Sequence, residues 1–111
     1  MLIDFDAMEE TVIPHFQGGE GALHAQMRVD ELGKILRGTL EPGSTIGLHT
    51  HDTGSEVIYI LSGKGKILYD DGCEPLEAGS CHYCPKGHTH SLINDSPEGD
   101  LCFFAVVSEQ P

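Results

Sequence analysis

The chain is poor in basic residues, and this limits the partners that it can bind. Its 111 residues include six Lys and Arg against eighteen Asp and Glu, which gives a formal net charge of -12. A chain with this charge repels phosphate backbones and anionic lipid headgroups. We therefore expect neither a nucleic acid nor a membrane surface as its partner.

Long apolar runs are missing as well. No run approaches the roughly 20 residues that a membrane span needs, and the opening letters MLIDFDAMEE lack the basic region of a secretory signal. Four cysteines are few for this length and are better interpreted as reduced thiols than as a disulfide framework. These features predict a cytoplasmic protein. The chain also lacks a P-loop motif, which excludes that kind of phosphate site.

Helical periodicity is nowhere sustained, and strand signals take its place. Short runs rich in Val, Ile, Leu and aromatic residues alternate with Gly, Pro, Asp and Ser at intervals of about ten residues. These runs cover residues 22–29, 34–40, 44–51, 56–61, 65–70, 80–84, 90–94 and 101–107. The pattern predicts one all-β domain over residues 21–111, built as a sandwich or barrel. Residues 1–20 lack clean periodicity and are interpreted as an N-terminal arm.

Two of the predicted strands are apolar on both faces. In residues 56–61, Ile58 and Ile60 share a face with Glu56, and the residues between them, including Tyr59, form an apolar second face. Residues 101–107 are a continuous apolar run. The outer face of such strands needs cover from the N-terminal arm or from a second subunit. We therefore expect a homodimer.

The stretch GLHTHDTGSE places two histidines and an acid where few side chains can pack. His49 and His51 are two residues apart, so on a strand they project from the same face. Glu56 opens the next predicted strand, and PKGHTHSLIN later supplies His88 and His90. Three imidazoles and a carboxylate suit Mn, Fe, Co, Ni, Cu or Zn.

The spacing of these residues resembles the two signature motifs of the cupin superfamily. The first motif runs through Gly43, His49, His51, Glu56 and Gly63, and the second through Gly79, Pro85, Gly87, His90 and Asn94. All ten positions agree with the family pattern. The resemblance implies a single-domain jelly-roll β-barrel of two Greek keys. It also implies one divalent transition metal per chain, a structural hydrogen-bonding role for Asn94, and metal ligands at His49, His51, Glu56 and His90.

Three further residues are candidates for moving protons near the metal: His82, His88 and Tyr59. The sequence CHYC looks like a redox or zinc C-x-x-C, but it lies in a predicted strand, where alternation sends its two cysteines to opposite faces. Either Cys81 and Tyr83 or His82 and Cys84 then face the barrel interior. An inward His82 is the best candidate for a general acid or base. For His88 a place on the surface or behind the ligands is favoured, and for Tyr59 core packing.

A carboxylate ligand would need a cation beside the metal. The cations considered for this role are Arg28, Arg37, Lys64, Lys66 and Lys86. Among them Arg37 lies in the middle of a predicted strand, so it must find a partner if it points inward.

Two classes of function fit these observations. The first is a small metalloenzyme that acts on an oxygen-rich small molecule, a sugar or an organic acid, by isomerase-type or lyase-type Lewis-acid chemistry. An Fe- or Mn-dependent dioxygenase is another enzymatic alternative. The second class is a non-catalytic cupin that binds a small ligand. The fold alone does not choose among them.

Overall fold

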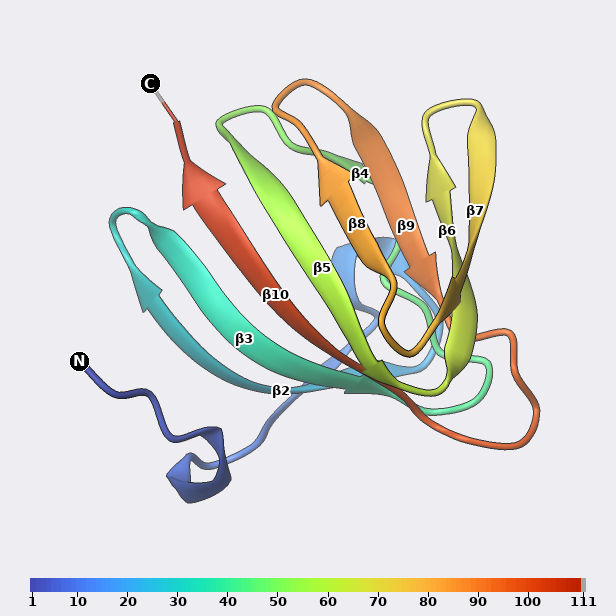
Figure 1. Cartoon of the computed structure of the whole chain (residues 1–111), viewed down its shortest axis with the longest axis horizontal. Helices are drawn as coiled ribbons and strands as arrows, with labels where there is room; N and C mark the ends of the chain where they lie inside the picture. The colour runs from blue at the N-terminus through green and yellow to red at the C-terminus, as the bar shows by residue number, and fades with distance from the viewer. Residues whose placement is uncertain (111) are drawn as a thin grey trace.

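The computed structural model describes residues 1–110, and two antiparallel sheets make up most of it (Figure 1). In chain order the elements are η1 (Phe5–Ala7), β1 (Thr11–Pro14), η2 (Phe16–Gly18), β2 (Ala22–Asp30), β3 (Gly33–Leu40), β4 (His49–Thr50), β5 (Gly54–Ser62), β6 (Lys64–Tyr69), β7 (Gly72–Glu77), β8 (Cys81–Cys84), β9 (Thr89–Ile93) and β10 (Leu101–Glu109). Among these described residues, no helix has the length and apolar character needed to cross a membrane.

The strand order is that of a jelly roll. The larger sheet has the order β1-β2-β3-β10-β5-β8, and the smaller sheet has the order β4-β9-β6-β7. The chain passes from one sheet to the other repeatedly, so that β10 lies between β3 and β5 while β9 lies between β4 and β6. Figure 1 shows β3, β10, β5 and β8 side by side in one layer, with β9, β6 and β7 grouped in the other. The all-β, jelly-roll prediction is confirmed.

The core lies between the two sheets and follows the alternation of the strands. Ile58 and Ile60 of β5 are buried, as predicted, and Phe103 of β10 is buried beside them. Burying each such side chain contributes roughly 1.5–3 kcal/mol. A Cβ at Gly38 of β3 would lie 2.4 Å from the Phe103 ring, so the aromatic ring requires a glycine opposite it.

The structure adds two strands that the sequence did not predict and shortens one that it did. β1 and β7 are edge strands, each paired with a single neighbour, and β7 contains Pro75. An edge strand buries few side chains and tolerates proline, which hides its sequence signal. The predicted strand 44–51 is reduced to β4 and an isolated bridge at Thr45. Here Gly47 passes so close to the Gln17 carbonyl oxygen that an added Cβ would lie 2.0 Å from it.

Residues near the N-terminus cover part of the outer face of the larger sheet. The Phe5 ring meets the Phe104 ring edge-on, with centroids 6.1 Å apart. Arg37 projects to this outer face, where its guanidinium lies 2.8 Å from an Asp6 carboxylate oxygen and over the Phe5 ring. Arg37 therefore has its partner in the arm and not in the interior.

Candidate metal centre

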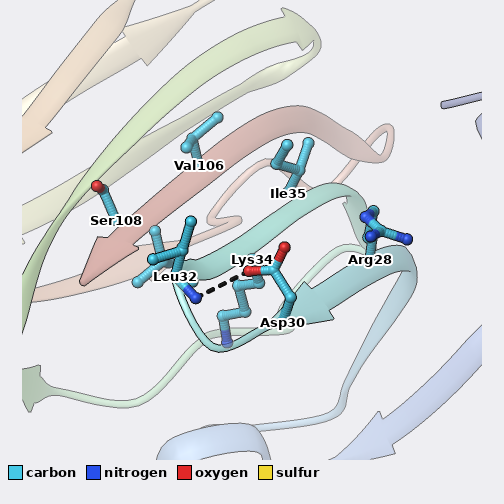
Figure 2. A pocket seen from close by; sticks show the side chains of 9 residues that line it. Arg28, Asp30, Leu32, Lys34, Ile35, Val106 and Ser108 are labelled. Carbon is cyan, nitrogen blue, oxygen red and sulfur yellow. Dashed lines mark hydrogen bonds between the residues drawn. The ribbon is translucent and has the colours of Figure 1, made fainter. Parts of the chain in front are cut away.

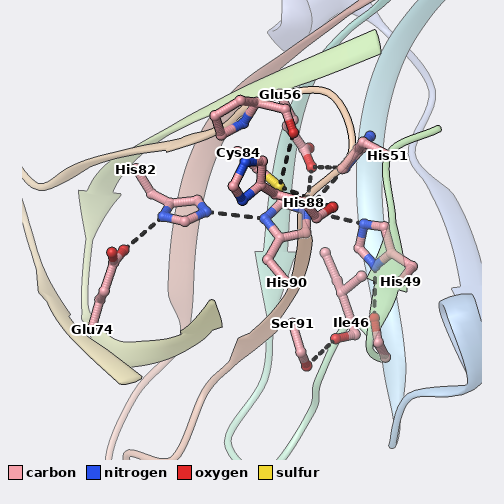
Figure 3. Close-up of polar contacts among 12 residues, drawn as sticks. Ile46, His49, His51, Glu56, Glu74, His82, Cys84, His88, His90 and Ser91 are labelled. Carbon is pink, nitrogen blue, oxygen red and sulfur yellow. Dashed lines mark hydrogen bonds and ion pairs between the residues drawn. The ribbon is translucent and has the colours of Figure 1, made fainter. Parts of the chain in front are cut away.

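Four side chains from both sheets converge at one point between them (Figure 3). His49 of β4 and His90 of β9 are register partners in the smaller sheet, and Glu56 comes from β5 of the larger sheet. His51 follows β4 and is fixed by backbone hydrogen bonds to Gly87 and His88. The ligand atoms of His49, His51, Glu56 and His90 all lie within 4.8 Å of one another.

His90 is at the centre of this cluster. Its Nε2 lies 3.0 Å from the His51 Nε2, 3.1 Å from the His49 Nε2 and 2.9 Å from a Glu56 carboxylate oxygen. The same Glu56 oxygen lies 3.0 Å from the His51 Nε2. Burial alone would raise the pKa of Glu56, but its hydrogen bonds with His51 and His90 outweigh burial and lower the pKa to about 2. Glu56 is therefore a carboxylate at neutral pH.

These contacts fit a metal ion. The His49 Nδ1 lies 2.7 Å from the Gly47 carbonyl oxygen, which can only accept a hydrogen bond, so this nitrogen carries the proton. The His49 Nε2 of a neutral ring is then a lone pair aimed into the cluster. In addition, burial lowers the pKa of His49, which favours this neutral form. Ligand atoms at right angles around a metal, each about 2.1 Å from it, are about 3.0 Å apart, which is close to the separations here. The cluster can therefore hold a divalent transition metal.

His82 faces the interior next to this cluster. It is 3% exposed, and Cys84 points inward with it while Cys81 and Tyr83 are exposed, which decides between the two predicted arrangements of β8. The His82 Nε2 lies 3.1 Å from the His90 Nδ1, and its Nδ1 lies 2.7 Å from a Glu74 carboxylate oxygen. Sequence reasoning missed Glu74 because it belongs to the unpredicted edge strand β7. Burial raises the pKa of the Cys84 thiol to about 11, so this thiol is protonated.

The structure does not bring His88 or Tyr59 to the ligand atoms. The His88 Nδ1 lies 2.6 Å from an Asp70 carboxylate oxygen and 3.2 Å from the Tyr69 hydroxyl, in a pair at the surface. Tyr59 is 43% exposed on the outer face of β5, opposite to the face that carries Glu56. The expectation that Tyr59 packs in the core is wrong, because alternation along β5 sends it outward.

A small cavity of about 40 Å³ reaches the ligands. Three of the clustered residues, His49, His51 and Glu56, line it. The rest of its wall consists mostly of apolar core residues, together with Phe16 and Gln17 of η2. Lys34 of β3 is the single Lys or Arg that lines it. Lys34 was not among the cations predicted from the sequence, because its place beside the cavity depends on where β3 lies in the fold.

A separate hollow of about 250 Å³ lies at the turn between β2 and β3 (Figure 2). Its wall includes Asp30 at the end of β2, Leu32 of the turn and Val106 of β10. The Leu32 backbone N–H donates to the Asp30 carboxylate. None of the four clustered ligand residues lines it, although Lys34 lines both spaces. The small cavity reaches three of the four clustered residues, and a further hollow of about 290 Å³ reaches one of them, His51.

Fold and cluster together define a jelly-roll protein with a three-histidine, one-glutamate site. The family described as "Cupin domain" matches residues 36–107, and the chain belongs to this family. A relative from Thermotoga maritima named "Oxalate-binding protein" is 34% identical over 107 residues, covering 86% of this chain and 83% of that protein.

Solved structures agree with this assignment. A crystal structure of a "predicted oxalate decarboxylase" from Thermotoga maritima has a TM-score of 0.92 at 28% identity and covers 99% of this chain and 100% of that chain. The cupin domain of Cnp3 from Schizosaccharomyces pombe has a TM-score of 0.79 at 11% identity and covers 99% of this chain and 74% of that chain. The second similarity shows the fold alone.

Proposed function

We propose that His49, His51, Glu56 and His90 bind one divalent transition metal and that this metal binds a small organic acid in the adjoining cavity. The observation that carries the proposal is the position of the cluster beside a cavity that three of its four residues line together with a single cation. The metal would supply Lewis-acid polarisation of a carboxylate or neighbouring carbonyl oxygen. Such polarisation suits isomerase-type or lyase-type chemistry.

The cavity favours an organic acid over a sugar. Lys34 can neutralise a carboxylate, whereas a sugar needs a larger set of hydrogen-bonding side chains. Apart from the ligands, Gln17 and Lys34 are the polar side chains that line the cavity, and its volume of about 40 Å³ suits a very small molecule. The names given to the matches from Thermotoga maritima refer to oxalate and support a small dicarboxylate.

Non-catalytic binding of the same acid is the second candidate. An enzyme of this kind needs a titratable group beside the bound molecule, whereas a binding protein needs shape and hydrogen bonds alone. Lys34 is the one titratable side chain on the cavity wall besides the ligands. His82, predicted from the sequence as the best acid or base, lies behind His90 and does not line the cavity.

Metal analysis and titration calorimetry test this function. Protein purified without a metal-affinity tag is analysed for metals, loaded with Mn or Zn, and titrated with oxalate. We expect Lys34→Met to weaken oxalate binding about tenfold or more, because a charge-assisted hydrogen bond is lost, with the metal content unchanged. Lys64→Met is the matched control, since Lys64 is exposed on β6 and does not line the cavity. Metal-loaded wild-type protein that binds no oxalate would refute the ligand class.

We also propose a cytoplasmic homodimer that forms through the outer face of the larger sheet. Val57, Tyr59, Leu61 and Tyr83 are exposed there on the neighbouring strands β5 and β8. A chain with a net charge of -12 can self-associate most readily through a patch without charges. Light scattering should give twice the chain mass for wild type and the chain mass for Tyr59→Glu. A monomeric wild type would contradict the dimer.

A further inference from the structure

We infer that Glu74 and His82 are positioning residues that fix the proton on the Nδ1 of His90 and so turn its Nε2 into a metal ligand. The inference rests on the proposed metal centre. It comes from a line of three side chains, Glu74, His82 and His90, which runs from β7 through β8 to β9 (Figure 3). Glu74 and His90 belong to the smaller sheet and His82 to the larger one, so the line also joins the sheets.

The direction of each hydrogen bond follows from the two ends of the line. A Glu74 carboxylate can only accept, so the His82 Nδ1 at 2.7 Å must donate to it. At the other end, a His90 Nε2 that binds a metal carries no proton, so the one proton of this ring lies on its Nδ1. The His82 Nε2 is therefore an acceptor, and the His90 Nδ1 at 3.1 Å must donate. The His90 Nε2 is thereby left as a lone pair for the metal, which would replace the direct contact of this nitrogen with Glu56.

Packing holds the three groups in this order. His82 and His90 are 3% and 1% exposed, so water cannot replace the bond between them at low cost. Their rings are nearly parallel at 28°, and the Tyr69 ring meets His82 edge-on with centroids 5.3 Å apart. Glu74 is the outer end of the line, with its side chain 47% exposed. A charge at the surface thus sets the tautomer of a buried ring that it does not touch.

Loss of the acceptor at position 74 should reverse the line. Without Glu74, a neutral His82 can carry its proton on Nε2 and donate it to the His90 Nδ1. His90 would then carry its own proton on Nε2, and a protonated nitrogen cannot bind a metal. Partners that orient metal-ligating histidines typically contribute about 10- to 100-fold to metal affinity.

Zinc titration of the full chain in competition with a chelator tests the inference. We expect Glu74→Leu to lower Zn affinity about 10- to 100-fold, and Glu74→Gln to lower it by much less, because the amide oxygen still accepts from His82. Glu41→Leu is the matched control. Glu41 is an exposed acid 2.9 Å from the Nε2 of His24 and lies outside the cluster. Its affinity should equal that of wild type.

A second measurement reads the tautomer directly. Nitrogen-15 NMR of the metal-free protein should place the His82 proton on Nδ1 in wild type and Glu74→Gln, and on Nε2 in Glu74→Leu. Unchanged Zn affinity together with an unchanged tautomer in a folded Glu74→Leu would overturn the inference. Wild-type protein that binds no metal would refute the proposed function instead, and the NMR result would still decide the positioning role.

Discussion

Replacement of Asn94 should destabilise the fold strongly, because this one side chain joins three segments of backbone. Asn94 follows β9 and is 0% exposed. Its Nδ2 donates to the Leu40 carbonyl at 2.8 Å and to the Gly99 carbonyl at 3.0 Å, and its Oδ1 accepts from the Ser96 backbone N–H at 3.0 Å. The end of β3 and the loop before β10 are therefore held by a single buried amide.

The size of the effect follows from these three bonds. Each contributes a net 0.5–1.5 kcal/mol, so Asn94→Ala should lower the free energy of unfolding by about 3 kcal/mol. The bond to the Leu40 carbonyl is buried and the other two are partly buried, so water would replace them only in part. For a domain of about 100 residues, a loss of this size lowers the melting temperature by roughly 10–20 °C.

Urea unfolding of the metal-free protein measures this loss. The midpoint should fall with little change in slope, since the buried surface is the same. Asn94→Asp is the sharper variant, because it turns an N–H donor into an oxygen that faces two carbonyls. The protonated acid can donate one bond, so N94D should lose less stability, relative to wild type, at pH 4 than at pH 7. A loss below about 1 kcal/mol for Asn94→Ala would refute the structural role of the amide.

Two further predictions concern the metal centre and the core. Bound metal should dissociate as pH falls from roughly 6.5 to 5, because imidazoles must be unprotonated to coordinate. Burial lowers the pKa of His49, so this ring stays neutral at a lower pH than an exposed histidine and shifts the release of metal toward the lower end of that pH range. Metal analysis after dialysis at each pH measures the release. Release that is already complete at pH 7 would contradict the prediction. Gly38→Ala should destabilise the fold by about 1–3 kcal/mol, because the new Cβ would lie 2.4 Å from the Phe103 ring; Gly72→Ala, whose nearest contact would be at 3.6 Å, is the control in thermal unfolding.

The parts of this structure that the sequence predicted are those with a fixed spacing. Alternation along β5 placed Glu56 on the buried face with Ile58 and Ile60, since a strand has no other way to arrange them. The two-residue separation of His49 and His51 and the match to two family motifs brought the four ligand positions together, and the structure places them within 4.8 Å. The motif glycines Gly43, Gly63 and Gly79 have positive φ angles and lie between strands, where glycine allows the chain to turn.

The parts that sequence reasoning missed depend on which strands become neighbours. Glu74 lies on an edge strand whose alternation is interrupted by Pro75, so nothing local marks it as a partner of His82. Lys34 is one lysine among several until β3 places it beside the cavity. Tyr59 was considered for the interior, although the face that carries Glu56 leaves it outside. The positions of Glu74 and Lys34 follow from pairing between distant segments, which a local pattern does not encode, whereas that of Tyr59 follows from the alternation of β5.

A metal bound at this cluster would affect the stability of the fold as well as its chemistry. His49 and His90 belong to the smaller sheet and Glu56 to the larger one, so an ion bound to all three holds the two layers together. Such a link would add to the few backbone bonds that fix His49, because β4 is two residues long and pairs with β9 alone. A metal that binds only the folded state would raise the free energy of unfolding, and the increase would grow with the logarithm of the metal concentration divided by Kd. The line from Glu74 through His82 to His90 joins the same two sheets without a metal. It thereby holds His90 in a binding-ready orientation before the ion arrives, and lowers the cost of ordering the site on binding.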